Sequence, residues 1–93
     1  MDTDEFMEWL GNQLQDFLEL PAKTIESLEA GQRVCAEAKR KLDEMSPQTF
    51  SSTKSEFSQV WEKRKIGNFD IPFDDEYLSP LAGDILGTID GFF

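Results

Sequence analysis

Residues 21–45 read PAKTIESLEAGQRVCAEAKRKLDEM and hold one helical face over a greater length than any other segment of the chain. The apolar residues recur at spacings of three, four or seven, so at about 100° per residue they stay on one side of a helix. These residues are Ile25, Leu28, Cys35, Ala38, Leu42 and Met45. Gly31 falls on the same side. We expect the helix to continue through it because the apolar phase survives, and a break there is the alternative. The segment is predicted to be the central helix of a small helical domain.

An amphipathic first helix is predicted for residues 3–20. Asp2 or Thr3 can cap its start, and Pro21 ends it. The apolar face contains Phe6, Met7, Leu10, Leu14, Phe17 and Leu18. The opposite face contains Glu5, Glu8, Asn12, Asp16 and Glu19. Because almost no loop separates this helix from the next, the two should form a tight corner or an antiparallel hairpin.

A third helix is predicted from about 47 to 66. Ser46-Pro47 is typical of a helix start, with serine as the cap and proline at the first helical position. Gly67-Asn68 suits the end of that helix. Its buried face is expected to consist of Phe50, Phe57, Val60 and Trp61.

Residues 67–79 form an irregular segment rich in acidic and aromatic residues, which we call the acidic strap; Pro72 excludes a helix interior there. Ser79-Pro80 then opens a short fourth helix, which two glycines weaken by about 1 kcal/mol each. The prediction is an all-α fold with residues 1–93 as a single domain. It is a small bundle of three main helices plus a short C-terminal helix.

The composition limits the classes of function. The chain has 39% hydrophobic and 12% aromatic residues, which argues against intrinsic disorder. Its net charge of −10 disfavours direct binding to nucleic acid or to an anionic membrane and favours a protein partner with a basic surface. A single cysteine cannot form an internal disulfide. The acidic start and the lack of an apolar run of eighteen residues favour a cytoplasmic protein, with leaderless secretion left open.

Charge is segregated along the chain. Residues 1–21 hold six acids and no bases, residues 22–66 hold seven acids and nine bases, and residues 67–93 hold six acids and no bases. The basic middle contains two Lys-Arg-Lys triplets, at 39–41 and 63–65. The acidic ends could therefore be drawn onto these triplets within one molecule.

The residue types present exclude most catalytic chemistry. With no histidine and one cysteine, the chain cannot build a Ser/His or Cys/His nucleophile or a Cys/His zinc site. Carboxylate catalysis remains formally open, but there is no Ca²⁺-loop spacing and no glycine-rich phosphate loop. We therefore predict no enzymatic activity, no cofactor and no metal. Cys35 is expected to be a small apolar residue in a helix seam.

The acidic strap is the first candidate site for a partner. Apolar anchors beside carboxylates are what a docking segment needs. The candidate residues in the strap are Asp70, Phe73, Asp74, Asp75, Glu76 and Tyr77. The alternative is that Phe69, Ile71 and Phe73 seal one end of the bundle. Asp70-Ile71-Pro72-Phe73 also resembles the acidic tip of bacterial single-stranded DNA-binding proteins, although here twenty residues follow it.

The acidic row of the first helix is the second candidate site. Its members are Glu5, Glu8, Asp16 and Glu19. The row spans about 21 Å at 1.5 Å per residue, a length over which duplex DNA presents roughly twelve phosphates. The row is therefore interpreted as a solvated face, with mimicry of nucleic acid as the alternative.

These observations predict a non-enzymatic acidic protein-binding module, an inhibitor or regulator that occupies a basic surface of a nucleic-acid-handling protein. A phage or mobile-element anti-defence origin would suit that role. The alternative is a structural or chaperone-like subunit that joins a larger assembly through an apolar helix face, with Trp61 and Phe92-Phe93 as anchors. Homodimerisation through the small-residue seam is conceivable, and we do not predict it.

Overall fold

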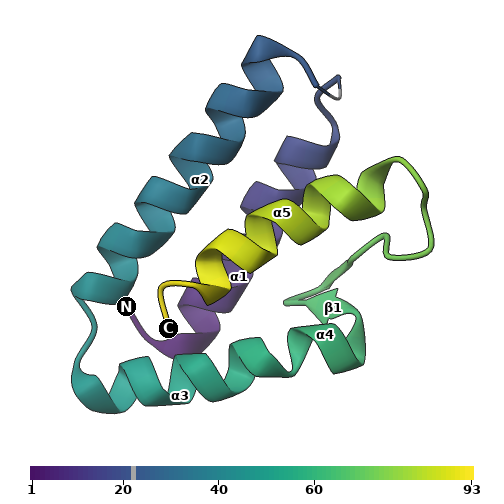
Figure 1. Cartoon of the computed structure of the whole chain (residues 1–93). Helices are drawn as coiled ribbons and strands as arrows, with labels where there is room; N and C mark the ends of the chain where they lie inside the picture. Colours follow the sequence, from purple (N-terminus) through teal and green to yellow (C-terminus); the bar gives the residue numbers. More distant parts are fainter. Residues whose placement is uncertain (22) are drawn as a thin grey trace.

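A computed structural model describes residues 1–21 and 23–93 and confirms the all-α fold class (Figure 1). In chain order the elements are α1 (Thr3–Leu18), α2 (Ile25–Asp43), α3 (Pro47–Ser58), α4 (Val60–Lys63), β1 (Lys65–Ile66), β2 (Phe69–Asp70) and α5 (Leu78–Asp90). Within these described residues, no helix combines the length and the apolar character needed to cross a membrane.

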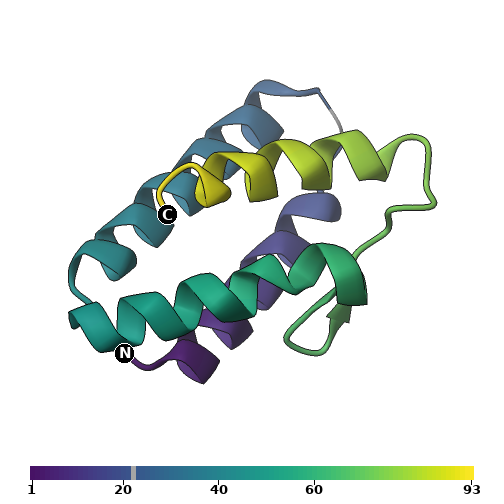
Figure 2. The ribbon, with the colours of Figure 1, turned by 60° about the horizontal axis from the view of Figure 1, so that its bottom comes forward.

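The central helix is α1 rather than the expected segment 21–45. It contacts α2, α3, α5 and the small hairpin of β1 and β2, and Figure 2 shows it passing behind α3. Asp2 caps it by accepting a hydrogen bond from the backbone N–H of Glu5 at 2.8 Å. Its buried residues are Phe6, Met7, Leu10, Gly11, Leu14 and Phe17. These match the predicted apolar face except that Leu18 is half-buried and Gly11 joins it.

Helix α2 is continuous through Gly31, as expected, but it buries only part of the predicted face, because Ala38 and Leu42 are buried while Cys35 and Met45 are half-buried. Its buried residues are Ser27, Ala30, Val34, Ala38 and Leu42. Ile25 and Leu28 are instead 78% and 63% exposed. Small side chains let α2 approach its neighbours closely. The Ser27 hydroxyl tolerates burial because it donates to the carbonyl of Thr24 at 2.9 Å within a capping box.

The third helix ends earlier than the predicted residue 66. Helix α3 stops at Ser58, one turn of α4 follows, and Arg64 adopts a left-handed conformation with φ of 56°. The chain then forms a two-strand antiparallel hairpin that pairs Ile66 with Phe69. Gly67, with φ of +56°, occupies its turn. Pairing holds Ile66 in the core, at 1% exposure, which a continued helix would not do.

The C-terminal residues fold back onto α3. The Phe93 ring lies 5.4 Å from the ring of Phe50 and 5.3 Å from that of Phe57, between ring centroids. Phe92 is half-buried against the same core. The Phe92-Phe93 pair therefore packs on the core, with both side chains half-buried.

Candidate functional site

The predicted acidic row lies on the outer face of α1. Its side chains are Glu5, Glu8, Asp16 and Glu19, and all four are exposed. At 100° per residue they point away from the six buried residues of the helix. In the described part of the chain, none of these carboxylates has a cation within 4 Å. We call this surface the outer face of α1.

The hairpin extends this acidic surface. Asp70 on β2 lines a shallow hollow of about 360 Å³ together with Glu8, Asn12 and Gln15 of α1. Asp70 forms an exposed ion pair with Lys65 across the hairpin, at 3.6 Å. One predicted strap residue and one predicted α1 residue are therefore brought together, although the nearby cation offsets part of the charge.

The rest of the strap packs onto the core more than it projects. Ile71 is 5% exposed, and Phe69 and Phe73 are half-buried against the core. The Phe73 ring stacks on Trp61 with ring centroids 5.6 Å apart. Asp74 accepts a hydrogen bond from the Arg64 guanidinium at 3.2 Å. This geometry fits the interpretation that the strap seals one end of the bundle. The role of the strap as a docking segment remains a prediction.

Asp75 has a structural task at the start of α5. One of its carboxylate oxygens accepts hydrogen bonds from the backbone N–H groups of Tyr77 at 2.8 Å and Leu78 at 2.9 Å. The predicted cap at Ser79-Pro80 is therefore wrong, because the helix has already begun there. Pro80 is tolerated since the N–H groups of the first turn lack partners within the helix. Glu76 is exposed, and Tyr77 is 82% exposed.

We expect Asp75→Ala to lower the free energy of unfolding by about 1 kcal/mol, because two N–H groups lose their acceptor. The matched control is Asp74→Ala, which removes an exposed ion pair of about 0–1 kcal/mol in worth. Urea denaturation followed by circular dichroism compares the two. Equal effects of both substitutions would contradict the capping role.

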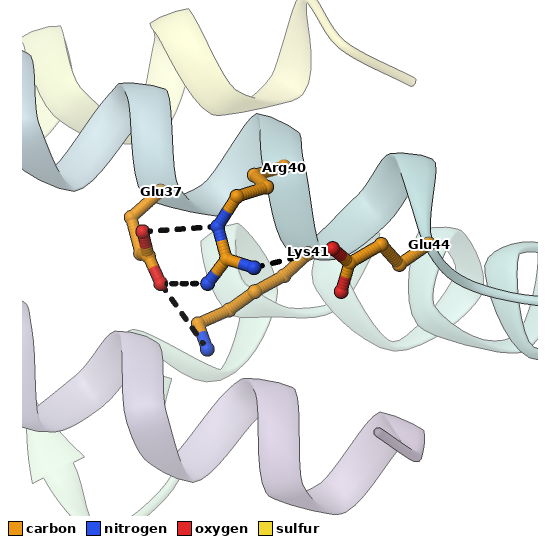
Figure 3. Close-up of polar contacts among 4 residues, drawn as sticks. All are labelled: Glu37, Arg40, Lys41 and Glu44. Carbon is orange, nitrogen blue, oxygen red and sulfur yellow. Dashed lines mark hydrogen bonds and ion pairs between the residues drawn. The ribbon is translucent and has the colours of Figure 1, made fainter.

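Two members of the first Lys-Arg-Lys triplet, Arg40 and Lys41, form ion pairs with carboxylates of their own helix (Figure 3). Arg40 pairs with Glu37 and, at 3.2 Å, with Glu44, while Lys41 lies 3.5 Å from Glu37. Arg40 is the main cause that lowers the pKa of the exposed Glu37 carboxyl from its ordinary value. The Lys41 ammonium also lies 5.1 Å from the centroid of the Trp9 ring on α1. Among the described residues, only the second triplet forms ion pairs with an acidic end of the chain, through Asp74 and Asp70 of the strap.

A groove between α2 and α5 was missed by the sequence reasoning. It encloses about 610 Å³. Its apolar lining consists of Phe17, Ile25, Leu28, Gly31, Cys35, Leu81 and Ile85. The sequence contained a pattern that could have indicated this groove. Helix α2 carries two offset apolar stripes, one of large residues that includes Ile25 and Leu28 and one of smaller residues that includes Ala30 and Val34. Because only one stripe can face α1, the other is left to line a second surface. We call this feature the α2–α5 groove.

Cys35, the single cysteine, lies in this groove and is half-buried. Burial raises the pKa of its thiol, and the nearby Thr88 hydroxyl of α5 acts in the opposite direction. The thiol is therefore less ionised than a free cysteine at neutral pH, which makes it a poor nucleophile. Its position suits a reporter of what enters the groove.

Comparison of the chain with protein-family models, with curated proteins and with solved structures finds no match. Over residues 1–21 and 23–93, no group of three acidic, cysteine or histidine side chains is arranged to hold a metal ion. The outer face of α1 and the α2–α5 groove are the two surfaces from which function can be argued.

Proposed function

We propose that the chain is a non-enzymatic acidic protein-binding module that occupies a basic surface of another protein. The observation that carries this proposal is the outer face of α1. Its carboxylates are exposed and lie farther than 4 Å from any cation of the described residues. In contrast, Asp70, Asp74 and Asp75 of the strap are engaged within the chain.

The basic surface is proposed to belong to a nucleic-acid-handling protein, which the chain inhibits or regulates. Such proteins hold phosphate with lysine and arginine, so a rigid row of carboxylates can compete for the same cations. Three of the four carboxylates are carried on the sixteen-residue helix α1 and Glu19 is its C-cap residue, and the other side of the helix is packed against the core, so the backbone spacing of the row is fixed before binding. Association should be steered by charge and weakened by salt.

The test compares two variants of equal net charge. The first neutralises the outer face of α1 with Glu5→Gln, Glu8→Gln, Asp16→Asn and Glu19→Gln. The control neutralises four exposed acids elsewhere: Glu26→Gln, Asp43→Asn, Glu62→Gln and Asp90→Asn. Tagged proteins are used to recover partners from nuclease-treated lysate of the natural host, with washes at low and high salt.

We expect the unmodified chain to recover a basic, nucleic-acid-binding partner that high salt removes. The outer-face variant should bind that partner at least roughly tenfold more weakly, which is about 1.4 kcal/mol, and the control should bind within about twofold. The purified chain should also displace DNA or RNA from the recovered partner. If both variants lost the same affinity for the partner, net charge alone would explain the effect. If both variants kept their affinity, the outer face of α1 would be excluded as the binding surface.

The α2–α5 groove favours a second candidate function, a subunit that joins an assembly through an apolar surface. Ile25 and Leu28 are exposed large hydrophobic residues on one wall of it. Of the two anchors expected from the sequence, Phe93 favours this function less because it packs on Phe57, whereas Trp61 stacks on Phe73 but is 41% exposed rather than buried as predicted. A salt-resistant partner would support this second candidate.

A further inference from the structure

The α2–α5 groove lies on the side of α1 opposite its acidic outer face. Phe17, which belongs to the buried face of α1, lines the groove together with Gly31 and Ile85. A Cβ atom at position 31 would come within 3.3 Å of the Phe17 ring, so glycine keeps this part of the groove open. The groove is therefore a surface separate from the one used in the proposed function.

The two walls of the groove determine which secondary structure a bound segment can have. Both walls are helices, α2 and α5, whose N–H and C=O groups are used within the helices. At the start of α2, the N–H groups of Thr24 and Ser27 are also occupied, because each donates to the side chain of the other. An extended segment would find no backbone partners in the groove and would bury unsatisfied polar groups. A helix satisfies its own backbone and can lie there without that cost.

The length of the groove sets the length of that helix. The lining of α2 runs from Thr24 to Cys35, which is about 17 Å at 1.5 Å per residue. An entering helix of about eleven residues, three turns, matches this length. Its anchors would be apolar residues at positions i, i+3 or i+4, and i+7, packing between Leu28 on one wall and Leu81 on the other.

The charged residues along the edges of the groove determine which charge is favoured beside the apolar stripe of the entering helix. Along the groove, Asp84 lines the α5 wall, and Glu29 lies one turn after Ile25 on α2. Helix α5 carries no lysine or arginine. The single cation of the lining, Lys23, lies at the end before α2 begins. With a chain charge of −10, an occupant with lysine or arginine on both flanks is favoured.

We propose that the α2–α5 groove is a docking site for an amphipathic helix of a partner protein, with an apolar stripe of three anchors and basic residues on both flanks. Leu28 and Ile25 supply the contact on one wall, and Leu81 and Ile85 supply it on the other. Asp84 lines the groove on the α5 wall, and Glu29 lies one turn from Ile25 on α2, so these two carboxylates are assigned to pair with the basic flanks.

Three synthetic peptides of equal length test the proposal on the full chain. One carries leucines at i, i+4 and i+7 with flanking lysines, the second replaces those lysines with glutamates, and the third scrambles the leucines so that no stripe forms. Fluorescence anisotropy of labelled peptide measures affinity. The rate at which iodoacetamide modifies Cys35 reports whether the peptide covers the groove, because the chain has no other cysteine.

The expected result is that only the basic striped peptide binds well and slows modification of Cys35. Leu28→Lys should weaken it at least roughly tenfold, which is the size of an interface anchor. Tyr77→Lys is the matched control, with the same change of charge at a side chain that is 82% exposed outside the groove, and it should leave affinity unchanged. Both variants alter exposed positions, so both should fold.

Four results would overturn the proposal. The first is that the glutamate or scrambled peptide binds as tightly as the basic striped peptide, and the second is that both variants lose the same affinity. The third is that no peptide binds, and the fourth is that a small apolar dye protects Cys35 from modification but the peptides do not.

Self-association of the chain in sedimentation, if Leu28→Lys abolished it, would also overturn the proposal and assign the groove to a second copy of the chain. The groove variants leave the outer face of α1 intact, so failure here is distinguishable from failure of the proposed function.

Discussion

Replacing Phe57 with alanine is expected to lower the free energy of unfolding by about 3–5 kcal/mol, the usual cost of emptying a buried phenylalanine site. Phe57 is 0% exposed on α3, and its ring packs on that of Phe93. A chain of this length has a total stability of about 5–15 kcal/mol. The variant should therefore lose a large share of its stability, as measured by urea denaturation followed by circular dichroism.

Two further substitutions separate packing from general disturbance. Phe57→Leu keeps most of the volume and should cost less than about 1.5 kcal/mol. Tyr77→Ala removes a side chain that is 82% exposed, and it should change stability by no more than about 0.5 kcal/mol. An alanine at position 57 that costs as little as one at position 77 would show that Phe57 is not part of the core.

Features that depend on residues within one helix could be predicted from the sequence, whereas features that depend on neighbouring elements could not. The face of α1 and its cap at Asp2 were predictable because one helix contains both the pattern and its consequence. The same holds for Ser46 at the start of α3. The bulky stripe of α2 misled the prediction because burial of Ile25 and Leu28 depends on which neighbours reach them. Large side chains suggested a core at the start of α2, while the helix packs there through Ala30 and Val34, and only farther along through the predicted Ala38 and Leu42.

The candidate site was predictable only in part for the same reason. The exposure of Glu5 and Glu8 followed from the helical period of α1. The engagement of Asp74 with Arg64 joins residues ten positions apart and depends on the hairpin, which the predicted helix to residue 66 concealed. The role of Asp75 had a local signal, an aspartate three residues before the first residue of α5. The Ser-Pro pair nearby suggested a different start.

Gly11→Ala is expected to lower the free energy of unfolding by about 1–3 kcal/mol, the range for overpacking a tight contact. A Cβ atom on Gly11 would lie 2.8 Å from the backbone carbonyl oxygen of Ile66. That oxygen belongs to the hairpin and cannot rotate away as a side chain can. The strand must therefore move off α1, and Ile66, which is 1% exposed, must leave its place in the core.

Gly87→Ala is the matched control, because a Cβ atom there meets nothing within 4 Å. Alanine in the interior of α5 should raise stability by about 0.5–1 kcal/mol, the difference in helix propensity and in the entropy of the unfolded chain. The same chemical change thus has opposite signs at the two glycines. If both Gly11→Ala and Gly87→Ala raised stability, the hairpin would have moved away from α1 without an energetic cost. A loss at position 11 alone would establish that close approach of α1 to β1 holds the hairpin, and with it Asp70, beside the acidic outer face.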